Sequence, residues 1–315
     1  MSLKKDLQVL IEGLEESIYE NIVSVITKRP NWYLQLLKNQ FEKVQKKSLK
    51  KCIEEFVMNK SAKKILLLLL EEKESLRNNR FTQQHSKTKI QVKFLEVFFA
   101  MEKSELRSFH FDGWGGPEFS ESVKLIQSYI SSERNKNKEV LIDFLKEDLV
   151  KLAQAKENSF NFGEWCTVIN ERPKKHIKQL FQNYSFKFGS VFEADVQNCK
   201  TTNIFHKMLI LGMIDANLFY CKRLKQITLS TYWENDIIPI FVLLNKKKLK
   251  KISKMYEHFY KSSFSSIYDC FWNSQFKKLF FSLMHLPFDE ETLFKKNALD
   301  TFKVFQIEKE KNKVF

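Results

Sequence analysis

The residues whose types and spacing most clearly suggest a chemical role in this sequence are lysines in one short run. Five lysines, Lys246, Lys247, Lys248, Lys250 and Lys251, surround a single leucine, Leu249. Amines at this density attract acidic proteins and anionic lipid surfaces. A helix that starts here, with Leu249 turned inward and the lysines in solvent, explains the same pattern without a partner. Both interpretations stay open: a basic patch that holds an acidic partner, and a solvated helix start.

Motifs for catalysis or metal binding are not evident. No glycine-rich phosphate loop, His-Glu-x-x-His motif or nucleophile elbow occurs. The six histidines are scattered, and His176, beside Lys174 and Lys175, is interpreted as a surface or capping residue. The five cysteines lack zinc or redox spacing and are expected to be reduced, mostly buried thiols. We therefore predict that the chain is not an enzyme.

The composition indicates a folded, basic protein. Hydrophobic residues make up 43% and charged residues 29%, and the net charge is +15. Nucleic acid is a disfavoured partner because no recognised reader fold is evident and the aromatics fall at core spacing. The N-terminus has no signal-peptide pattern, and the longest apolar run, Ile65–Leu70, is too short to cross a bilayer. These features predict a cytoplasmic protein whose membrane contact, if any, is peripheral.

The elements that position these residues are predicted to be helices of an internal repeat. Only 7 glycines and 5 prolines occur, which disfavours an all-β fold. Four anchor positions, Arg29, Met101, Arg172 and Leu244, are spaced by 71 or 72 residues. Around each anchor, apolar residues step by three, four and seven, as on one face of a helix. Arg-Pro after such a stripe ends one helix and starts the next.

The apolar positions of the copies align with one another. In the first copy they are Ile22, Val25, Ile26, Leu34, Leu37, Phe41, Leu49, Ile53 and Ile65. In the third they are Trp165, Val168, Ile169, Ile177, Leu180, Tyr184, Phe192, Val196 and Met208. In the second they are Phe94, Val97, Phe98, Leu106 and Phe109, and in the fourth Ile237, Ile240, Phe241, Leu249, Ile252, Tyr256, Phe264, Tyr268 and Phe280.

These alignments predict four copies of about five helices each and a C-terminal tail. The predicted copies are 1–76, 77–138, 139–216 and 217–290, with the tail at 291–315. The second copy is predicted to be shortened, because glycines and a proline interrupt it at 111–117 and a polar linker follows at 131–138. In the third copy the helices are expected at 148–157, 163–172, 174–186, 190–198 and 202–214.

The repeat resembles that of the annexin family. Asp148-Leu149 is expected to open the first helix of the third copy, and Trp165 to Arg172 is similar to the family's second helix, W-x-x-I-x-x-x-R. His176 to Tyr184 resembles the third helix, and Phe219 to Leu224 the lead-in to the fourth repeat. The resemblance covers nearly the whole chain and implies an all-α curved disc. An unrelated helical solenoid is the alternative.

The resemblance implies calcium sites, but the expected ligands are missing. Family members hold calcium in a G-x-G-T loop between the first two helices, completed by an acidic residue near the end of the fourth. Here the first loop retains one glycine, in the degenerate segment Gly13, Leu14 and Glu15. The positions of the completing acid carry Phe56, Cys199 and Phe271. Calcium prefers a cage of oxygen ligands, so calcium binding of the family type is not expected.

Aromatic residues replace the calcium loops of the third and fourth copies. These are Phe160 and Phe162, then Tyr232 and Trp233, and Phe160 aligns with Tyr232. Rings with an apolar body and a polar tip favour the membrane interface, so the four residues are candidate membrane contacts. Packing beneath short loops is the alternative, because large aromatics are usually buried.

The functional expectation is a peripheral membrane protein that binds anionic phospholipid with weak or absent calcium dependence. Lysines near an anionic surface would replace the lost calcium bridge. The alternative is a structural or cytoskeleton-associated interaction protein that keeps the annexin disc and binds an acidic protein without binding lipid. Binding to liposomes that survives a calcium chelator is predicted by the first hypothesis.

Overall fold

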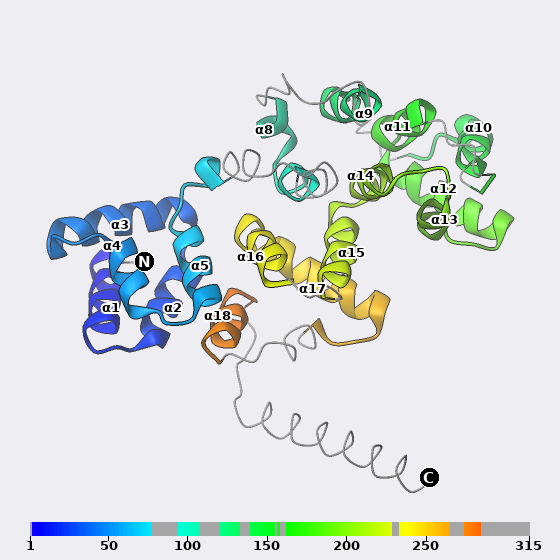
Figure 1. Ribbon diagram of the computed structural model, residues 1–315. Coiled ribbons are helices and arrows are strands. Elements are labelled where there is room, and N and C mark those ends of the chain that lie inside the picture. The colour runs from blue at the N-terminus through cyan, green and yellow to red at the C-terminus, as the bar shows by residue number, and fades with distance from the viewer. Residues whose placement is uncertain are drawn as a thin grey trace, which may run out of the picture. The chain divides into compact units, whose positions relative to one another are not determined.

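The elements of the computed structural model are α-helices (Figure 1). The structure describes residues 2–76, 94–107, 120–132, 139–154, 156–157, 162–228, 233–264 and 274–284, and these ranges contain no strand. The predicted all-α class is therefore confirmed. Contacts divide the chain into two compact units: unit 1 is Met1–Leu76 with Gln226–Phe315, and unit 2 is Arg77–Lys225. None of the helices in the described ranges combines the length and the hydropathy needed to cross a bilayer.

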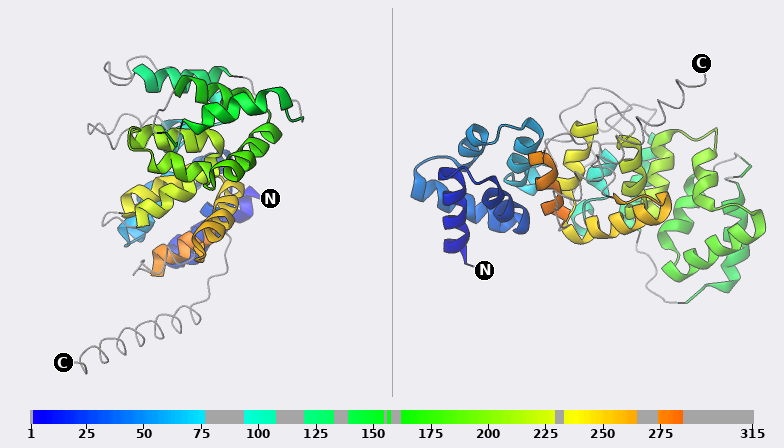
Figure 2. Two further views of the ribbon diagram at one scale, coloured as in Figure 1. Left: turned by 90° about the vertical axis from the view of Figure 1, so that its right-hand side faces the viewer. Right: turned by 90° about the horizontal axis from the view of Figure 1, so that it is seen from below.

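Unit 1 joins segments from both ends of the chain (Figure 1 and Figure 2). Helix α18 packs on α2 and α16 packs on α5. Tyr19 Oη donates to the Gln275 carbonyl over 3.0 Å, and Lys278 pairs with Glu20 over 2.9 Å. The sequence does not indicate that the first and fourth copies pack together. The helices of unit 1 are α1 (Leu3–Glu15), α2 (Tyr19–Lys28), α3 (Asn31–Gln45), α4 (Leu49–Phe56), α5 (Lys60–Leu69), α16 (Trp233–Leu243), α17 (Lys246–Tyr260) and α18 (Ser274–Met284).

Unit 2 packs its helices around aromatic side chains. The Phe99 ring lies 5.1 Å from the Phe219 ring and closely covers Gly212, where no side chain would fit. Buried Glu96 accepts from Arg223 Nε over 2.8 Å. The helices are α8 (Lys103–Arg107), α9 (Ser120–Ser131), α10 (Ile142–Ala153), α11 (Phe162–Glu171), α12 (Lys174–Phe188), α13 (Phe192–Asn198), α14 (Ile204–Ile214) and α15 (Ala216–Thr228), the last of which belongs to unit 2 up to Lys225.

The predicted register of buried positions is confirmed. All nine aligned apolar residues of the first copy and all nine of the third are buried, none more than 6% exposed. The predicted positions of the second and fourth copies are also buried, except Phe109 and Tyr268, which lie outside the described residues. Burial at this spacing is what places each helix face against the core.

The repeat also appears in the backbone at the end of the third helix. Helices α3, α12 and α17 end at Lys46, Gly189 and Lys261, all in the left-handed conformation with φ of 53°, 66° and 51°. The first two lie 143 residues apart and the last two 72, the spacing of the copies. Glycine adopts this conformation without a steric cost, whereas each lysine pays about 1 kcal/mol. The left-handed turn after the third helix is therefore present in the first and fourth copies, although lysine stands there in place of glycine.

The start of the third copy differs from the prediction. Its first helix is Ile142–Ala153, so Asp148 lies in the middle of α10 and does not open it. The next four helices lie within two residues of their predicted bounds. Pro30 and Pro173 each stand one position before a helix, as the N-cap, where the missing N–H has no consequence. The predicted break at 111–117 and linker residues 133–138 lie outside the described residues.

Candidate functional site

An aspartate of the first helix fixes the junction between the second and third helices in unit 1. Arg29, the C-cap of α2, donates to both carboxylate oxygens of Asp6 over 2.7 Å, and Tyr33 Oη donates to Asp6 Oδ2 over 2.6 Å. Hydrogen bonding from Arg29 lowers the pKa of Asp6. Burial, followed by the bond to Asp6, raises the pKa of Tyr33 to about 12. Three helices are therefore joined by one ionised carboxylate.

Unit 2 contains the same arrangement with histidine in place of tyrosine. Arg172 donates to Asp148 over 2.7 and 3.1 Å, and His176 Nε2 lies 2.9 Å from Asp148 Oδ2. The Leu141 backbone N–H donates to His176 Nδ1 over 3.2 Å. Since Nδ1 accepts, the proton of the neutral ring is on Nε2, facing the carboxylate. Of the two predicted roles, surface or capping residue, the first is wrong because His176 is fully buried, and the second agrees with its bond to the N–H of Leu141, the N-cap of α10.

The segment interpreted as a degenerate calcium loop in the first copy is helical. Gly13, Leu14 and Glu15 form the last turn of α1, and the Gly13 carbonyl accepts the Ile18 N–H over 2.8 Å. A side chain at Gly13 would meet Asn21 Cβ at 2.9 Å, so close packing of α2 explains this glycine. A family-type calcium loop needs free carbonyl oxygens here.

The other half of the expected calcium site also fails to fit. Phe56 is the last residue of α4 and supplies no carboxylate at the expected position. Cys199 is buried, and its sulfur lies near the Thr201 and Thr202 hydroxyls. Burial raises the pKa of Cys199, but hydrogen bonds from the hydroxyls and the backbone N–H groups of Thr201 and Thr202 together hold it below its ordinary value. Phe271 lies outside the described residues.

Two carboxylates line the same cavity at the end of unit 1 where α1 and α4 end. Glu15 and Glu55 line a cavity of about 350 Å³ together with Lys47. Within the described ranges, no three acidic, histidine or cysteine side chains come together as a metal site. The Gly13 segment and the Phe56 and Cys199 positions therefore do not match calcium binding of the family type, while Phe271 and the corresponding loops at 158–161 and 229–232 lie outside the described residues.

None of the four predicted aromatic membrane contacts has its side chain among those that the structure describes. Phe160 and Tyr232 lie outside the described residues. Phe162 and Trp233 are the first residues of α11 and α16, but the description does not extend to their side chains. Their contact with membrane therefore stays a prediction.

The predicted basic run is the N-terminal half of α17, and its inward leucine is confirmed. Leu249 is 2% exposed, whereas Lys247, Lys250 and Lys251 are exposed. Asn245 caps the helix by accepting the Lys248 N–H over 2.9 Å. The solvated helix start thus explains Lys250 and Lys251, but Lys246 and Lys247 line a cavity within unit 1.

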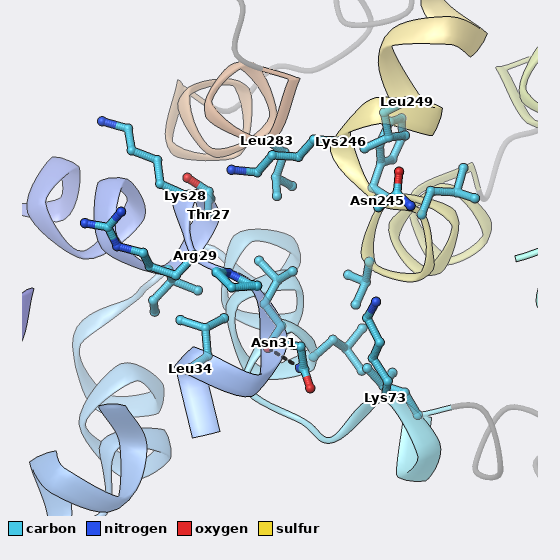
Figure 3. Close-up of a pocket in the computed structure, with 18 of the residues that line it drawn as sticks. Thr27, Lys28, Arg29, Asn31, Leu34, Lys73, Asn245, Lys246, Leu249 and Leu283 are labelled. Atoms are coloured by element: carbon cyan, nitrogen blue, oxygen red, sulfur yellow. Dashed lines mark hydrogen bonds between the residues drawn. The ribbon is translucent and has the colours of Figure 1, made fainter. Parts of the chain in front are cut away.

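This cavity, of about 410 Å³, collects the ends of several helices of unit 1 (Figure 3). The α2–α3 junction contributes Lys28 and Arg29, and the segment after α5 contributes Lys73. In Figure 3 the Lys246 amine extends from α17 toward α2, while Arg29 turns aside, toward its partner Asp6. We call the cavity with Lys28, Arg29, Lys73, Lys246 and Lys247 the cationic cavity.

Lys28 and Lys73 were not predicted as members of this site. The repeat places Arg29 and Leu244 at equivalent positions, which relates the two junctions along the sequence. It does not indicate that the junctions meet in space, because that follows from the packing of the first and fourth copies.

No protein-family model and no curated protein matches the sequence. Solved structures do match its fold. Chicken annexin V in complex with Zn²⁺ is similar with a TM-score of 0.72 and 13% identity, over 91% of this chain and 96% of that chain. Calcium-bound alpha-14 giardin is similar with a TM-score of 0.69 and 15% identity, over 91% and 100%. Annexin III gives 0.67 and 13%, over 90% and 94%. The protein therefore has the annexin fold.

Proposed function

We propose that this protein is a peripheral membrane protein that binds anionic phospholipid with little or no dependence on calcium. Its fold is shared with proteins crystallised with metal ions, among them calcium-bound alpha-14 giardin. The first copy lacks the loop and the acid that such a site requires, since Gly13 is helical and Phe56 replaces the carboxylate. These features of the first copy support lipid contact through side chains of this chain without a bridging ion.

The observation that carries the proposal is an exposed apolar residue on each of two turns at one end of unit 1. Met58, in the turn between α4 and α5, is 81% exposed, and Ile18, between α1 and α2, is 36% exposed. The ends of α1 and α4 line the same cavity through Leu14 and Phe56, so the two turns lie on the same side. Exposed apolar side chains on neighbouring turns can enter the headgroup region.

Electrostatic attraction supplies the rest of the binding. The chain carries a net charge of +15. Each lysine held near an anionic surface contributes about 1 kcal/mol, and the attraction weakens with salt. Glu15 and Glu55 lie at the same end of unit 1, so the attraction arises from the whole chain and not from this end alone.

The test replaces both apolar residues and measures pelleting with phosphatidylserine vesicles in the presence of chelator. Ile18→Ser with Met58→Ser is expected to weaken binding by about tenfold, because these exposed side chains would no longer transfer apolar surface from water into the headgroup region. Leu36→Ser is the matched control, since Leu36 is 51% exposed in the middle of α3. Equal pelleting of the two variants and the wild type would contradict the proposed contact.

A structural or cytoskeleton-associated protein without lipid binding is the second candidate. The observation that favours it is the pair of carboxylates Glu15 and Glu55 at the end of unit 1 where lipid is expected, since both are repelled by an anionic surface. This candidate predicts no pelleting with vesicles, with calcium or without it.

A further inference from the structure

The cationic cavity has the features of an anion site that the fold does not need for its own stability. Five cationic residues from three segments line it, and none of the described residues that line it is acidic. Like charges brought together without counter-charges repel one another. Such a group is unfavourable in the empty protein and is stabilised by an anion.

Two acidic groups close in sequence or in space to residues that line this cavity already have partners. Asp6 holds Arg29 over 2.7 Å on the side of α1, and Glu71 pairs with Lys50 over 2.6 Å. Glu72 and Glu74 are exposed and do not line the cavity. Neutralisation of Lys28, Lys73 and Lys246 is therefore left to a molecule from solution.

Among these lysines, the charged amine of Lys246 would be stabilised most by a bound anion. Lys246 is partly buried, and its amine extends toward α2 (Figure 3). Burial, followed by the positive charges of Arg29 and Lys28, lowers the pKa of Lys246. Apolar walls formed by residues such as Leu68, Phe241 and Leu283 reduce solvent screening and strengthen a charge interaction there.

The polar part of the cavity also matches a phosphate group. Asn31 and Lys246 begin α3 and α17, so two helix N-termini adjoin the lysines. Backbone N–H groups at helix N-termini favour phosphate oxygens, and lysine is a common partner of phosphate. A volume of about 410 Å³ suits a small molecule rather than a protein segment.

The position of the cavity indicates which source of phosphate it meets. It lies at the Lys28 end of α2, whereas Ile18 precedes the other end of the same helix. A helix of 10 residues is about 15 Å long, so a membrane held at Ile18 and Met58 leaves the cavity facing solvent.

We propose that the cationic cavity binds a small, soluble anion carrying several phosphate charges. The site is independent of the lipid-binding turns, and its ligand is neutralised by Lys73 and Lys246, while Lys247 and Lys28, whose amine points away from the cavity in Figure 3, add positive charge beside it. Arg29 keeps its bond to Asp6 and supplies charge without turning toward the ligand.

The experiment is isothermal titration of the full chain with inorganic tripolyphosphate. Lys73→Met with Lys246→Met removes two amines and keeps the apolar stems. We expect this pair to weaken binding by about tenfold or more, since it removes two charge-assisted contacts. The matched control, Lys250→Met with Lys251→Met, removes the same charge from exposed positions of α17 and is expected to weaken binding by less than about threefold. Equal melting temperatures of the two variants show that both are folded.

Two outcomes overturn the proposal: a wild-type chain that does not bind tripolyphosphate, and equal losses in the two variants, which indicate general attraction. A second arm identifies the source by pelleting with phosphatidylcholine vesicles that contain phosphatidylinositol bisphosphate. Pelleting unchanged by Lys73→Met with Lys246→Met supports a soluble ligand, and pelleting abolished by it contradicts that assignment. Failure of the lipid proposal is seen separately, as absence of wild-type pelleting with phosphatidylserine vesicles.

Discussion

The junctions at Arg29 and Arg172 are built alike and differ in their surroundings. In each, an arginine followed by proline binds an aspartate of the first helix, and a third side chain, Tyr33 or His176, bonds the same carboxylate. The hydrogen bond to Asp148, followed by the charges of Asp148, Glu171 and Glu147, raises the pKa of Arg172, and Lys151 lies 3.9 Å from the same aspartate. Around Arg29 the neighbouring charges include Lys28 and Lys246.

This difference distinguishes the interactions that stabilise the fold from the side chains that are available for binding. The aspartate–arginine bond is common to both units, so it is explained by the geometry of the repeat. Lysines lie near both junctions, since Lys174 and Lys175 follow Arg172-Pro173, but the cavity lined by cations and by no acidic residue adjoins Arg29 and is not required by that geometry. Charge near a structural feature that recurs in two copies is therefore a better guide to binding here than the feature itself.

The largest expected effect comes from removing the buried carboxylate in unit 2. Asp148→Asn leaves Arg172 and His176 without their partner in a site where the Asp148 side chain is fully buried. We expect a loss of about 3 kcal/mol, and about 2 kcal/mol for Asp6→Asn, whose side chain is 10% exposed. Hydrogen–deuterium exchange measured on peptides from α10–α12 and from α1–α3 assigns each loss to its unit. Equal losses at both sites would show that burial does not distinguish the two junctions.

A smaller effect tests the third side chain. Tyr33→Phe removes one hydrogen bond to Asp6 and is expected to cost about 1 kcal/mol. His176→Phe removes the bonds to both Asp148 and the Leu141 N–H, so about 2 kcal/mol is expected. Urea unfolding followed by circular dichroism gives the comparison. A larger loss for Tyr33→Phe would contradict the double role of His176.

The periodicity of apolar residues was sufficient to predict the helices and their buried faces. It placed the start of α10 six residues too late, and the reason is physical. The N-cap of α10, Leu141, has no capping side chain of its own, and its N–H is instead bonded by His176, 35 residues along the chain. A cap supplied from another helix leaves no local signal.

The cationic cavity was only half predicted for a related reason. The lysine run at the start of α17 was evident, but Lys28 and Lys73 join it through tertiary packing of the first and fourth copies. The aromatic residues Phe160, Phe162, Tyr232 and Trp233 were chosen by type and register, and neither property determines exposure.

Pelleting of the wild-type chain with phosphatidylserine vesicles, in calcium and in chelator, tests the central claim most directly. If side chains and net charge replace the calcium bridge, the two binding curves superimpose, and both weaken as salt rises above about 0.1 M. Binding that requires calcium and disappears with chelator would contradict the claim, and would show that ligands for calcium exist in this chain despite Phe56 and Cys199.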